Sequence, residues 1–352
     1  MSIRISIPAL LLAAMLACTP TPPPDEPEPT VDRSFKVLTW NLYLGTAFES
    51  LFSVSSIDQV PAATAAAWAA VQATDFADRA EAIADRIAAA QPHLVGLQEV
   101  ELYRLQSPSD GWTGTPATTV VLDFLDLLQQ ALVARGQDYV VAVSMDNVDF
   151  EAPMTTTGGE DDIRITDRDV VLARSDVVVE NPAKHHYTNM TRYPIPGTPF
   201  AISVPKAWVS VELLFKDRRS WFVNTHLEIP GSPNTVQQGQ VSELVQALAA
   251  TDLPTVLVGD FNAAPGNPVY QSVVEAGFDD TWLLAGQSES GTCCQAADLG
   301  NTTSSLHTRI DHVFLRGGLD ATGVAVQGVT PDQRSPGGLW PSDHAGVAVT
   351  VN

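Results

Sequence analysis

Several apolar runs in this sequence end in side chains that can hold a cation or move a proton. They are carboxylates, amides and imidazoles at or near the ends of six runs typical of β-strands: Asn41 after VLTW, Glu99 after LVGLQ, His226 after WFVNT, Asp260 and Asn262 after VLVG, Asp311 in RIDHVF, and Asp343 with His344 in PSDH. One such residue has no special meaning, because every strand must end somewhere polar. Six together indicate one shared rim, since sites in layered α/β folds form where strands end.

These residue types suit the hydrolysis of a phosphoester. Hard divalent cations such as Mg²⁺ prefer carboxylate oxygens and take only one or two from the protein, which Glu99 and Asp343 can supply. Phosphoryl transfer also requires a base for the attacking water and stabilisation of developing negative charge. A histidine beside an acid provides the base, and amide donors with a second histidine provide part of the stabilisation. The sequence contains none of the competing signatures GxSxG, HExxH, GxxxxGK[ST] and CxxC.

The hydrophobic pattern predicts the elements that must position these residues. Helices are predicted over 75–90, 120–134 and 241–250. Strands are predicted over 35–43, 93–100, 170–173, 207–215, 221–227, 256–261, 310–315 and 347–351. Because strands both alternate with helices and follow one another directly, we expect a layered α/β fold with mixed sheets.

A set of motifs in a fixed order resembles the deoxyribonuclease-I-like superfamily of endonucleases, exonucleases and phosphatases. The motifs are TWNLYLG (39–45), GLQEV (96–100), NTHLE (224–228), GDFNAAP (259–265), RIDHVF (309–314) and SDH (342–344). The superfamily includes nucleases, apurinic/apyrimidinic endonucleases, inositol-phosphate phosphatases and neutral sphingomyelinases. The resemblance implies a four-layer α/β sandwich, in which two mixed β-sheets are flanked by helices.

The resemblance also implies a metal site. Glu99 resembles the main Mg²⁺ ligand of the superfamily, and Asp343 resembles a second carboxylate at the metal. Asn41 supports the metal and the substrate phosphate. We therefore expect Mg²⁺ as the cofactor, with Mn²⁺ and Ca²⁺ as the alternatives.

Five further residues resemble the catalytic group of the superfamily. His344 resembles the base, and Asp311 orients its imidazole. Asp260 is the rival for activating the water. Asp260 and Asn262 together resemble the pair that positions the nucleophile and the phosphate. His226 resembles the second histidine, which bonds a phosphoryl oxygen or acts as an acid.

Arg168 and two pairs of adjacent residues are further candidates. Arg168, in ITDRDVVLAR, either contacts a substrate phosphate or forms a salt bridge at a strand end. We interpret His185 and His186 as loop surface and not as a metal pair, because adjacent residues of a strand point in different directions. The neighbours Cys293 and Cys294 can bond each other only as a vicinal disulfide. For them we favour a packed loop over a redox or metal-binding pair, since reactive cysteines require a special environment.

The first residues predict export and a lipid anchor. Arg4 precedes an apolar run over 7–17, which is too short to span a membrane and is typical of a secretory signal. The run ends in MLAC, which resembles a bacterial lipobox with Cys18 as the lipidated residue; an ordinary signal peptide is the alternative. We expect an exported lipoprotein that is anchored to a membrane or secreted. Its segments are a signal over 1–18, a Pro- and acid-rich linker over 19–33 and a catalytic domain over 34–352.

The charge balance bears on the substrate. The chain has 19 Lys and Arg against 41 Asp and Glu, for a net charge of −22. Such a surface repels polyanions on average, so we expect no stable binding of nucleic acid. A nuclease also requires basic clusters at its groove, and the best ones here are KHH at 184–186 and KDRR at 216–219, the latter in a hairpin-like connection.

We therefore predict a monomeric, metal-dependent phosphodiesterase or phosphatase, with a lipid or small phosphoester favoured over polymeric DNA. A secreted endonuclease or exonuclease is one alternative. A non-catalytic binding lipoprotein on the same fold is an alternative of another class. Degenerate members of such a superfamily usually lose a metal carboxylate or the terminal histidine, and this chain keeps both Asp343 and His344.

Overall fold

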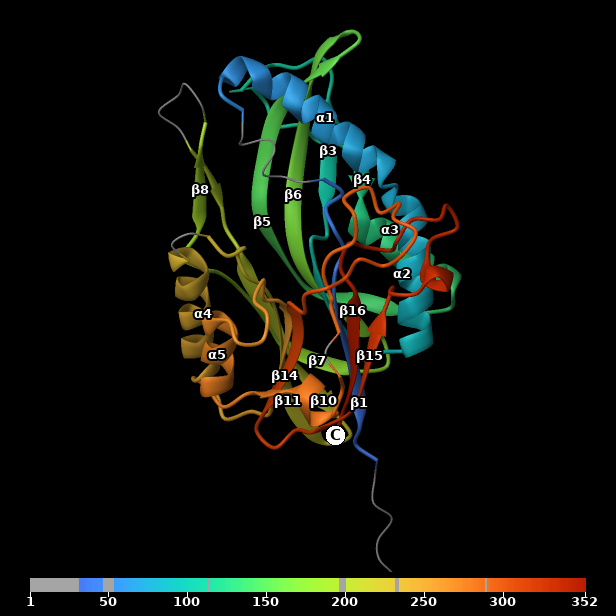
Figure 1. Ribbon diagram of the computed structural model, residues 1–352, viewed down its shortest axis with the longest axis vertical. Coiled ribbons are helices and arrows are strands. Elements are labelled where there is room, and N and C mark those ends of the chain that lie inside the picture. Colours follow the sequence, from blue (N-terminus) through green and yellow to red (C-terminus); the bar gives the residue numbers. More distant parts are fainter. Residues whose placement is uncertain (1–31, 47–53, 113, 196–200, 232–233, 289) are drawn as a thin grey trace, which may run out of the picture. The chain divides into compact units, whose positions relative to one another are not determined.

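The part of the chain that the structure describes contains every predicted catalytic and metal-binding residue. The computed structural model describes residues 32–46, 54–112, 114–195, 201–231, 234–288 and 290–352 (Figure 1). All but Asp32 belong to one unit, Arg33–Asn352. The predicted signal, Cys18 and residues 19–31 lie outside the described residues. Within those residues, no helix is long and apolar enough to cross a membrane.

Among the described residues, the larger sheet has eight strands. They are β1 (Phe35–Asn41), β2 (Leu94–Gln98), β3 (Leu102–Gln106), β4 (Thr119–Asp123), β5 (Tyr139–Thr156), β6 (Gly159–Arg174), β15 (Ala321–Gln327) and β16 (Gly346–Val351). Their order is β15-β16-β1-β2-β6-β3-β4, with β5 paired to β6 in a long hairpin (Figure 1). Strands β1 and β2 are parallel, whereas their other neighbours are antiparallel, so the sheet is mixed.

The smaller sheet has six strands in the described part of the chain. In spatial order they are β13 (Asp279–Asp280), β14 (Asp311–Arg316), β12 (Thr255–Asp260), β11 (Arg218–His226), β10 (Ala207–Phe215) and β7 (Val178–His186). Strands β11 and β12 are parallel, and the other pairs are antiparallel. A separate two-stranded ribbon consists of β8 (Thr191–Pro194) and β9 (Ala201–Val204).

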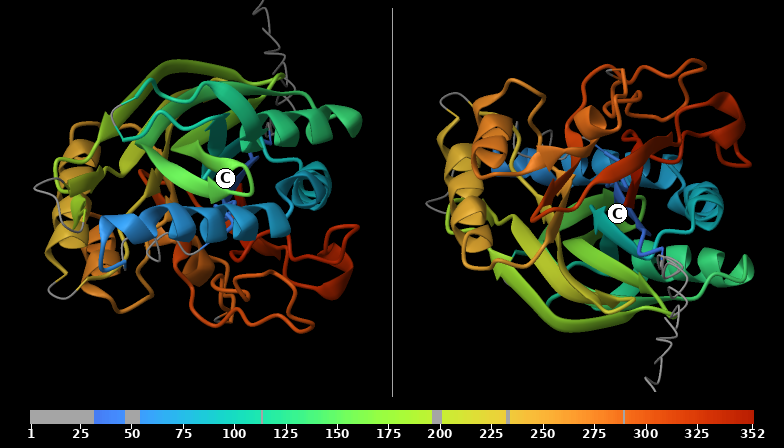
Figure 2. Two further views of the ribbon diagram at one scale, coloured as in Figure 1. Left: turned by 90° about the horizontal axis from the view of Figure 1, so that it is seen from above. Right: turned by 90° about the horizontal axis from the view of Figure 1, so that it is seen from below.

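Helices cover the outer faces of the two sheets. The larger sheet packs against α1 (Val60–Ala73), α2 (Phe76–Ala90) and α3 (Phe124–Ala134). The smaller sheet packs against α4 (Thr235–Leu248) and α5 (Pro268–Glu275), and the short α6 (Thr281–Leu284) lies beside β14. Figures 1 and 2 show α4 and α5 on the side opposite α2 and α3. This arrangement confirms the predicted four-layer sandwich with two mixed sheets.

Strand β1 shows why the central strands are apolar on both faces. Its Leu38 and Trp40 join the core under the helices, and its Phe35 and Val37 join the core between the two sheets. A strand covered on both sides carries a continuous apolar run and no alternation. The polar residue that follows such a run therefore marks the place where the strand leaves the core.

The predicted helices are partly confirmed. The helix predicted over 75–90 is α2, and the Asp75 side chain caps its N-terminus by accepting from the backbone N–H of Asp78. The helix predicted over 120–134 is wrong in its first part, where β4 precedes α3. Asp123 accepts from the backbone N–H groups of Leu125 and Asp126, so the helix begins only after that cap.

Two predictions concern the surface around β10. The predicted hairpin at 216–219 is confirmed, because β10 and β11 pair as neighbours on either side of it. His185 and His186 are exposed as expected, but they end strand β7 and do not lie in a loop. They are strand residues because Ala207 and Trp208 of β10 pair with them.

Candidate active site

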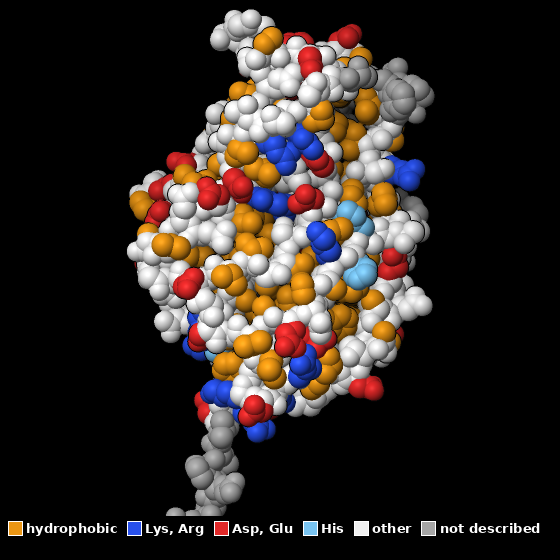
Figure 3. All heavy atoms as spheres, turned by 180° about the vertical axis from the view of Figure 1, so that it is seen from behind, with side chains coloured by type: hydrophobic (Ala, Val, Ile, Leu, Met, Phe, Trp, Pro, Cys, Tyr) orange, Lys and Arg blue, Asp and Glu red, His pale blue; other side chains and the backbone are white. Residues whose placement is uncertain are grey.

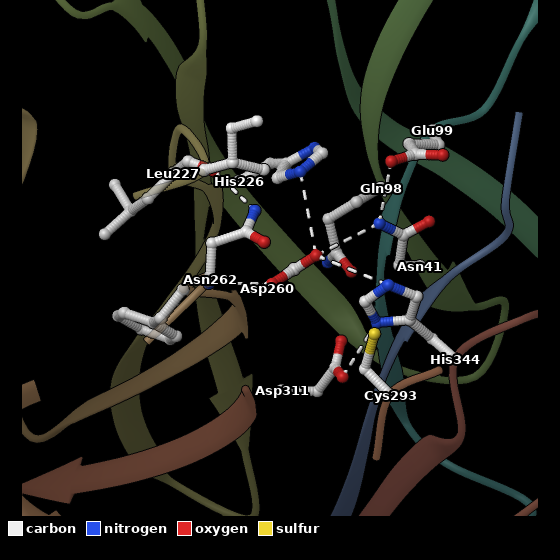
Figure 4. Close-up of polar contacts among 12 residues, drawn as sticks. Asn41, Gln98, Glu99, His226, Leu227, Asp260, Asn262, Cys293, Asp311 and His344 are labelled. Carbon is white, nitrogen blue, oxygen red and sulfur yellow. Dashed lines mark hydrogen bonds and ion pairs between the residues drawn. The ribbon is translucent and has the colours of Figure 1, made fainter. Parts of the chain in front are cut away.

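The strands of the smaller sheet bring three of the predicted residues into one row. His226 ends β11 beside Asp260 at the end of the parallel β12. Asp260 in turn lies opposite Asp311, the first residue of the antiparallel β14. His344 reaches this row from the segment before β16 (Figure 4). Three strand ends and one loop thus supply a row of acids and imidazoles.

The larger sheet supplies the predicted metal ligands. Asn41 ends β1 beside Gln98, the last residue of the parallel β2, and Glu99 follows. The Asn41 side-chain N–H group donates to Glu99 Oε1 at 3.0 Å, and the backbone N–H of Leu44 donates to Glu99 Oε2 at 2.8 Å. Asp343 lines the same cleft. Two carboxylates and an amide are a donor set that suits a hard divalent cation.

His344 is held through its ring and through its backbone. Its Nδ1 lies 2.9 Å from Asp311 Oδ2. A carboxylate only accepts, so in the neutral ring Nδ1 carries the hydrogen and Nε2 keeps its lone pair. The His344 backbone N–H donates to Ser342 Oγ at 3.1 Å, and Ser342 Oγ donates to the Asn41 backbone carbonyl at 2.7 Å. The geometry therefore leaves Nε2 available to accept a proton.

Asp260 lies between the two histidines. Its Oδ2 is 3.8 Å from His344 Nε2 and 3.7 Å from His226 Nε2, and it accepts from the Asn41 side-chain N–H group at 3.1 Å. Both distances exceed a hydrogen bond, so neither imidazole is bonded to Asp260 through its Nε2. Asp260 is therefore a second candidate base at the same place.

Asn262 holds the Asp260 carboxylate. Its backbone N–H donates to Asp260 Oδ1 at 2.8 Å, from a residue with φ of 48°. Its side-chain N–H group donates to the Leu227 backbone carbonyl at 2.9 Å. That amide is thus engaged with the backbone, and the role of Asn262 that this geometry favours is to position Asp260.

The comparisons with known proteins agree with this geometry. The family model described as "Endonuclease/Exonuclease/phosphatase family" matches residues 38–344. The chain belongs to this family. Members of the endonuclease/exonuclease/phosphatase family are typically metal-dependent phosphoesterases, and they include both phosphatases and nucleases. No curated protein sequence matches the chain.

Solved structures share the fold at low sequence identity. One is an endonuclease/exonuclease/phosphatase family protein from Leptotrichia buccalis, with a TM-score of 0.56, 16% identity and coverage of 90% of this chain and 99% of that one. Another is a mannosyl-6-phosphatase from Bacteroides thetaiotaomicron, with the same four values. A third, from Beutenbergia cavernae, has a TM-score of 0.53 and 21% identity, and covers 91% of this chain and 72% of that one.

Nearby carboxylates shift the pKa values of the two candidate bases, His344 and Asp260. Burial by itself lowers the pKa of His344, but the charges of Asp311, Asp343 and Asp260 together hold that pKa well above its usual value. Burial, and then the charge of Asp311, raises the pKa of Asp260 to about 7, although His344 opposes this. The two groups therefore titrate as a pair.

The pKa values of two other groups in the cleft, Asp343 and His226, shift in opposite directions. Burial raises the pKa of Asp343 to about 6, with His344 opposing and Glu99 adding to the shift. A divalent cation beside these two carboxylates would relieve their repulsion. Burial, and then the charge of Lys206, holds the pKa of His226 well below its usual value, so this ring is neutral near pH 7.

Arg168 does not reach the cleft. Its Nε donates to the Val100 backbone carbonyl at 2.7 Å, and its Nη2 donates to the Glu101 backbone carbonyl at 3.1 Å and forms a salt bridge with Asp123. A guanidinium engaged in this way is not available for a substrate. The prediction of a phosphate contact is therefore wrong. Arg168 forms a salt bridge, as the alternative predicted, but it does so from within β6, and only its partner Asp123 ends a strand.

A different cation, Lys206, lies in the cleft. Its Nζ is 3.2 Å from His226 Nδ1 and 3.3 Å from Nε2. Burial by itself lowers the pKa of Lys206, but surrounding carboxylates, first that of Asp167, raise it above its usual value, so the amine is charged. Among the described residues that line the cleft it is the one Lys or Arg. Lys206 belongs to no recognised motif. Its one signal in the sequence is its place just before β10, the strand that pairs with β11, which carries His226.

An apolar groove adjoins the cleft. The cleft is open to solvent. The groove is much smaller than the cleft, is also open to solvent, and lies between α1 and the β5–β6 hairpin. Thr46 and Ile165 line both spaces, and the rest of the groove is mostly apolar: Ala67, Trp68, Val71, Tyr103, Phe150, Ala152 and Ile163, with Thr64.

Proposed function

We propose that this chain is an exported, Mg²⁺-dependent hydrolase that cleaves a phosphoester carrying an apolar group. One observation carries the catalytic part of the proposal. Glu99, which accepts from the Asn41 amide, lines the same cleft as His344, whose Nδ1 is held 2.9 Å from the Asp311 carboxylate. A cation site and a base at one cleft are the two requirements for activating water against a phosphoester.

The metal side of the site would consist of Glu99, Asp343 and Asn41. The fit is chemical: burial raises the pKa of Asp343 to about 6 and the charge of Glu99 adds to the shift, so a divalent cation beside these two carboxylates would relieve their repulsion. When bound, the cation supplies Lewis-acid polarisation of a phosphoryl oxygen. The backbone N–H of Leu44 and the Asn41 amide keep the Glu99 carboxylate turned to the cleft.

The base side would use His344. Its Nε2 takes the proton of the attacking water, and the Asp311 carboxylate stabilises the imidazolium that forms. Asp260 accepts from Asn41 and Asn262, and it orients the water between the two histidines. This assignment requires neutral His344, so the rate rises as the pH passes the raised pKa of that ring.

The phosphoryl oxygens would be held on the other side of the cleft. His226 is neutral near pH 7 and can donate one hydrogen bond. Lys206 beside it supplies a positive charge where negative charge develops. Lys206, which lies beside His226, thus takes the place of Arg168 as the cation proposed to contact the phosphate.

The surroundings of the cleft favour an amphiphilic substrate over a nucleic acid. Lys206 is the one Lys or Arg of the described lining, whereas contacts to a polymeric phosphate backbone require several. Figure 3 shows one whole face of the molecule, on which acidic, basic and apolar side chains are interspersed, so this face has no continuous basic surface. The apolar groove meets the cleft at Thr46 and Ile165, which is where a group attached to the phosphoester would lie.

Tyr103 links the groove to the metal side. Its ring lies 5.1 Å from that of Trp68 in the groove, and its hydroxyl donates to the Leu44 backbone carbonyl at 2.8 Å. The Leu44 N–H holds Glu99. An apolar group that fills the groove would therefore pack against the residues that fix the main carboxylate ligand.

The catalytic proposal is tested with the full chain and bis-p-nitrophenyl phosphate. We expect hydrolysis that requires Mg²⁺ and stops with EDTA. Glu99→Gln should abolish this turnover without unfolding the protein, because an amide cannot supply the anionic oxygen. Glu160→Gln, at an exposed glutamate of the β5–β6 hairpin, is the matched control and should retain it. A Glu99→Gln enzyme at the wild-type rate would remove Glu99 from the site.

The substrate proposal is tested with a series of phosphodiesters that share one head group and differ in alkyl chain length. Each methylene buried in the groove should raise kcat/KM by up to about fourfold, since it contributes about 0.8 kcal/mol. Trp68→Ala should flatten this dependence, whereas Trp112→Ala, at an exposed tryptophan outside the groove lining, should not. Equal kcat/KM along the series, or a preference for single-stranded DNA, would contradict the proposal.

A further inference from the structure

Two adjacent cysteines form part of the wall of the cleft. Cys293 and Cys294 both line it, and their sulfurs are joined as a vicinal disulfide. The Cys293 backbone forms β-bridges with Thr308 on one side and His344 on the other. The backbone N–H of Ala345 donates to the Thr292 carbonyl at 2.7 Å, which fixes this segment against the one that carries His344.

The two sulfurs lie beside the imidazole of the proposed base. One sulfur from each cysteine and one ring nitrogen of His344 all lie within 4.8 Å of one another. Figure 4 shows the Cys293 sulfur next to the His344 ring, on the side that faces Asp311. Cys293 is only 6% exposed, so its sulfur belongs to the interior of the cleft wall and not to the outer surface.

These three side chains are chemically unlike the Glu99 and Asp343 pair. Thiolates and imidazole select Zn²⁺, Cd²⁺ and other soft or borderline cations, whereas carboxylates and amides select Mg²⁺ and Ca²⁺. The carboxylates of Asp260, Asp311 and Asp343 surround His344 and add negative charge that favours any cation there. The cleft thus holds two neighbouring donor sets of opposite preference.

We propose that Cys293, Cys294 and His344 form a binding site for a soft divalent cation, which opens when the disulfide is reduced and which inhibits the hydrolase when filled. Reduction by a trialkylphosphine and water gives two thiols and the phosphine oxide. The two thiols then release two protons as they bind the cation together with the His344 nitrogen. In the disulfide, each sulfur is bonded to the other and no thiolate is available.

A cation bound to either ring nitrogen of His344 would inhibit the hydrolase. Nδ1 is the atom that Asp311 holds, and Nε2 is the atom left to take the proton of the water. A cation on Nδ1 displaces the hydrogen bond that orients the ring, and a cation on Nε2 removes the lone pair of the base. The oxidised chain should therefore be active in the presence of Cd²⁺ under conditions that silence the reduced chain.

The experiment uses the full chain, oxidised or reduced by the phosphine and then freed of it, with Cd²⁺ added in excess Mg²⁺. The reduced protein should bind about one equivalent and develop the sulfur-to-cadmium charge-transfer absorption, and its turnover should fall about tenfold or more. The oxidised protein should show neither change. The absorption reports binding even if the chain hydrolyses nothing, so the site and the hydrolase are tested separately.

Variants identify the ligands. Cys293→Ser with Cys294→Ser should abolish the absorption and the inhibition, measured against the double variant's own rate without Cd²⁺. His344→Ala should keep the absorption but weaken Cd²⁺ binding at least about tenfold. His307→Ala, at an exposed histidine next to this segment, is the matched control and should change neither. Equal Cd²⁺ binding by the oxidised and reduced chains, or unchanged affinity in His344→Ala, would overturn the proposal.

Discussion

His344 and Asp260 are two candidate bases whose titrations are linked, and this linkage distinguishes them. The pKa of His344 is held well above its usual value, partly by the Asp260 carboxylate. The pKa of Asp260 is raised to about 7, and the charge of His344 limits that rise. Each group stabilises the charged form of the other. Removing one therefore shifts the titration of the other in a direction that the structure fixes.

His344→Ala gives opposite results for the two bases. Without the imidazolium, Asp260 keeps its burial and the charge of Asp311, so its pKa should rise above about 7. With His344 as the base, we expect kcat/KM to fall by about 10²–10⁴-fold and the ascending limb of the wild-type pH profile to disappear. With Asp260 as the sole base, most activity would remain and the limb would move to higher pH.

Asp311→Asn tests the orientation of the ring. The Asp311 charge raises the pKa of both His344 and Asp260, so its removal should move the ascending limb to lower pH whichever group is the base. The maximal rate, reached above the ascending limb, is what distinguishes His344 from Asp260 as the base. The carboxylate 2.9 Å from Nδ1 can only accept, whereas the amide that replaces it can also donate, so the tautomer of His344 is no longer fixed and the maximal rate should fall by about 10²-fold or more.

The assay is kcat/KM for bis-p-nitrophenyl phosphate with saturating Mg²⁺, from about pH 5 to about pH 9, the range in which a histidine base titrates. His307→Ala, at an exposed histidine outside the cleft lining, is the matched control and should reproduce the wild-type profile. Urea unfolding of each variant separates a loss of fold from a loss of base. A His344→Ala enzyme near the wild-type maximal rate would refute the assignment of the base.

Three further predictions concern Lys206, Arg79 and Cys18. Lys206→Met should lower kcat/KM about 10–100-fold, the range for loss of a charged hydrogen bond, whereas Lys184→Met at an exposed lysine should not; equal losses would exclude Lys206 as the phosphate contact. Arg79→Met removes the donor for four buried backbone carbonyls and should lower the free energy of unfolding by about 3 kcal/mol or more in urea titrations; a variant of wild-type stability would show that these bonds contribute little. Cys18→Ser should release a membrane-associated protein into the soluble fraction, and equal partitioning of both forms would contradict the lipid anchor.

The sequence predicts the site residues at strand ends better than the other side chains around the cleft. Asn41, Glu99, His226, Asp260 and the other strand-end residues could be predicted because each follows an apolar run whose burial fixes where the strand ends. Neighbouring strand ends then meet through register alone, as His226 and Asp260 do in β11 and β12. No knowledge of loop conformation is needed for that part of the site.

Arg168 and Lys206 show where this reasoning stops. Arg168 stands in a strand near the site in sequence, but its guanidinium binds two backbone carbonyls and Asp123 behind the cleft. Lys206 has no motif, and it reaches His226 because β10 pairs with β11 across a hairpin. Which way a long cationic side chain points depends on carboxylates brought in by tertiary structure, and local pattern does not encode it.

The sequence does not predict the whole β5–β6 hairpin or helix α1, for the same reason. The β5–β6 hairpin was predicted only as a strand over 170–173, because its outer part carries acids and glycines that the strand pattern does not favour. Pairing over the whole length of the two strands fixes that outer part. Helix α1, rich in alanine, has too little apolar contrast between its faces for a periodic signal. Tertiary contacts decide both cases.

Asn41 connects the two halves of the site, Glu99 at the larger sheet and Asp260 at the smaller sheet. Its side-chain N–H group donates to Glu99 Oε1 at 3.0 Å and to Asp260 Oδ2 at 3.1 Å, and its Oδ1 accepts from the Tyr43 N–H at 2.9 Å. One amide therefore joins Glu99 of the larger sheet, the proposed metal ligand, to the Asp260 carboxylate of the smaller one. Aspartate could not do this, because it only accepts and would add a third negative charge between two carboxylates. The amide at the end of β1 is thus required by its two acidic neighbours as much as by any contact with substrate.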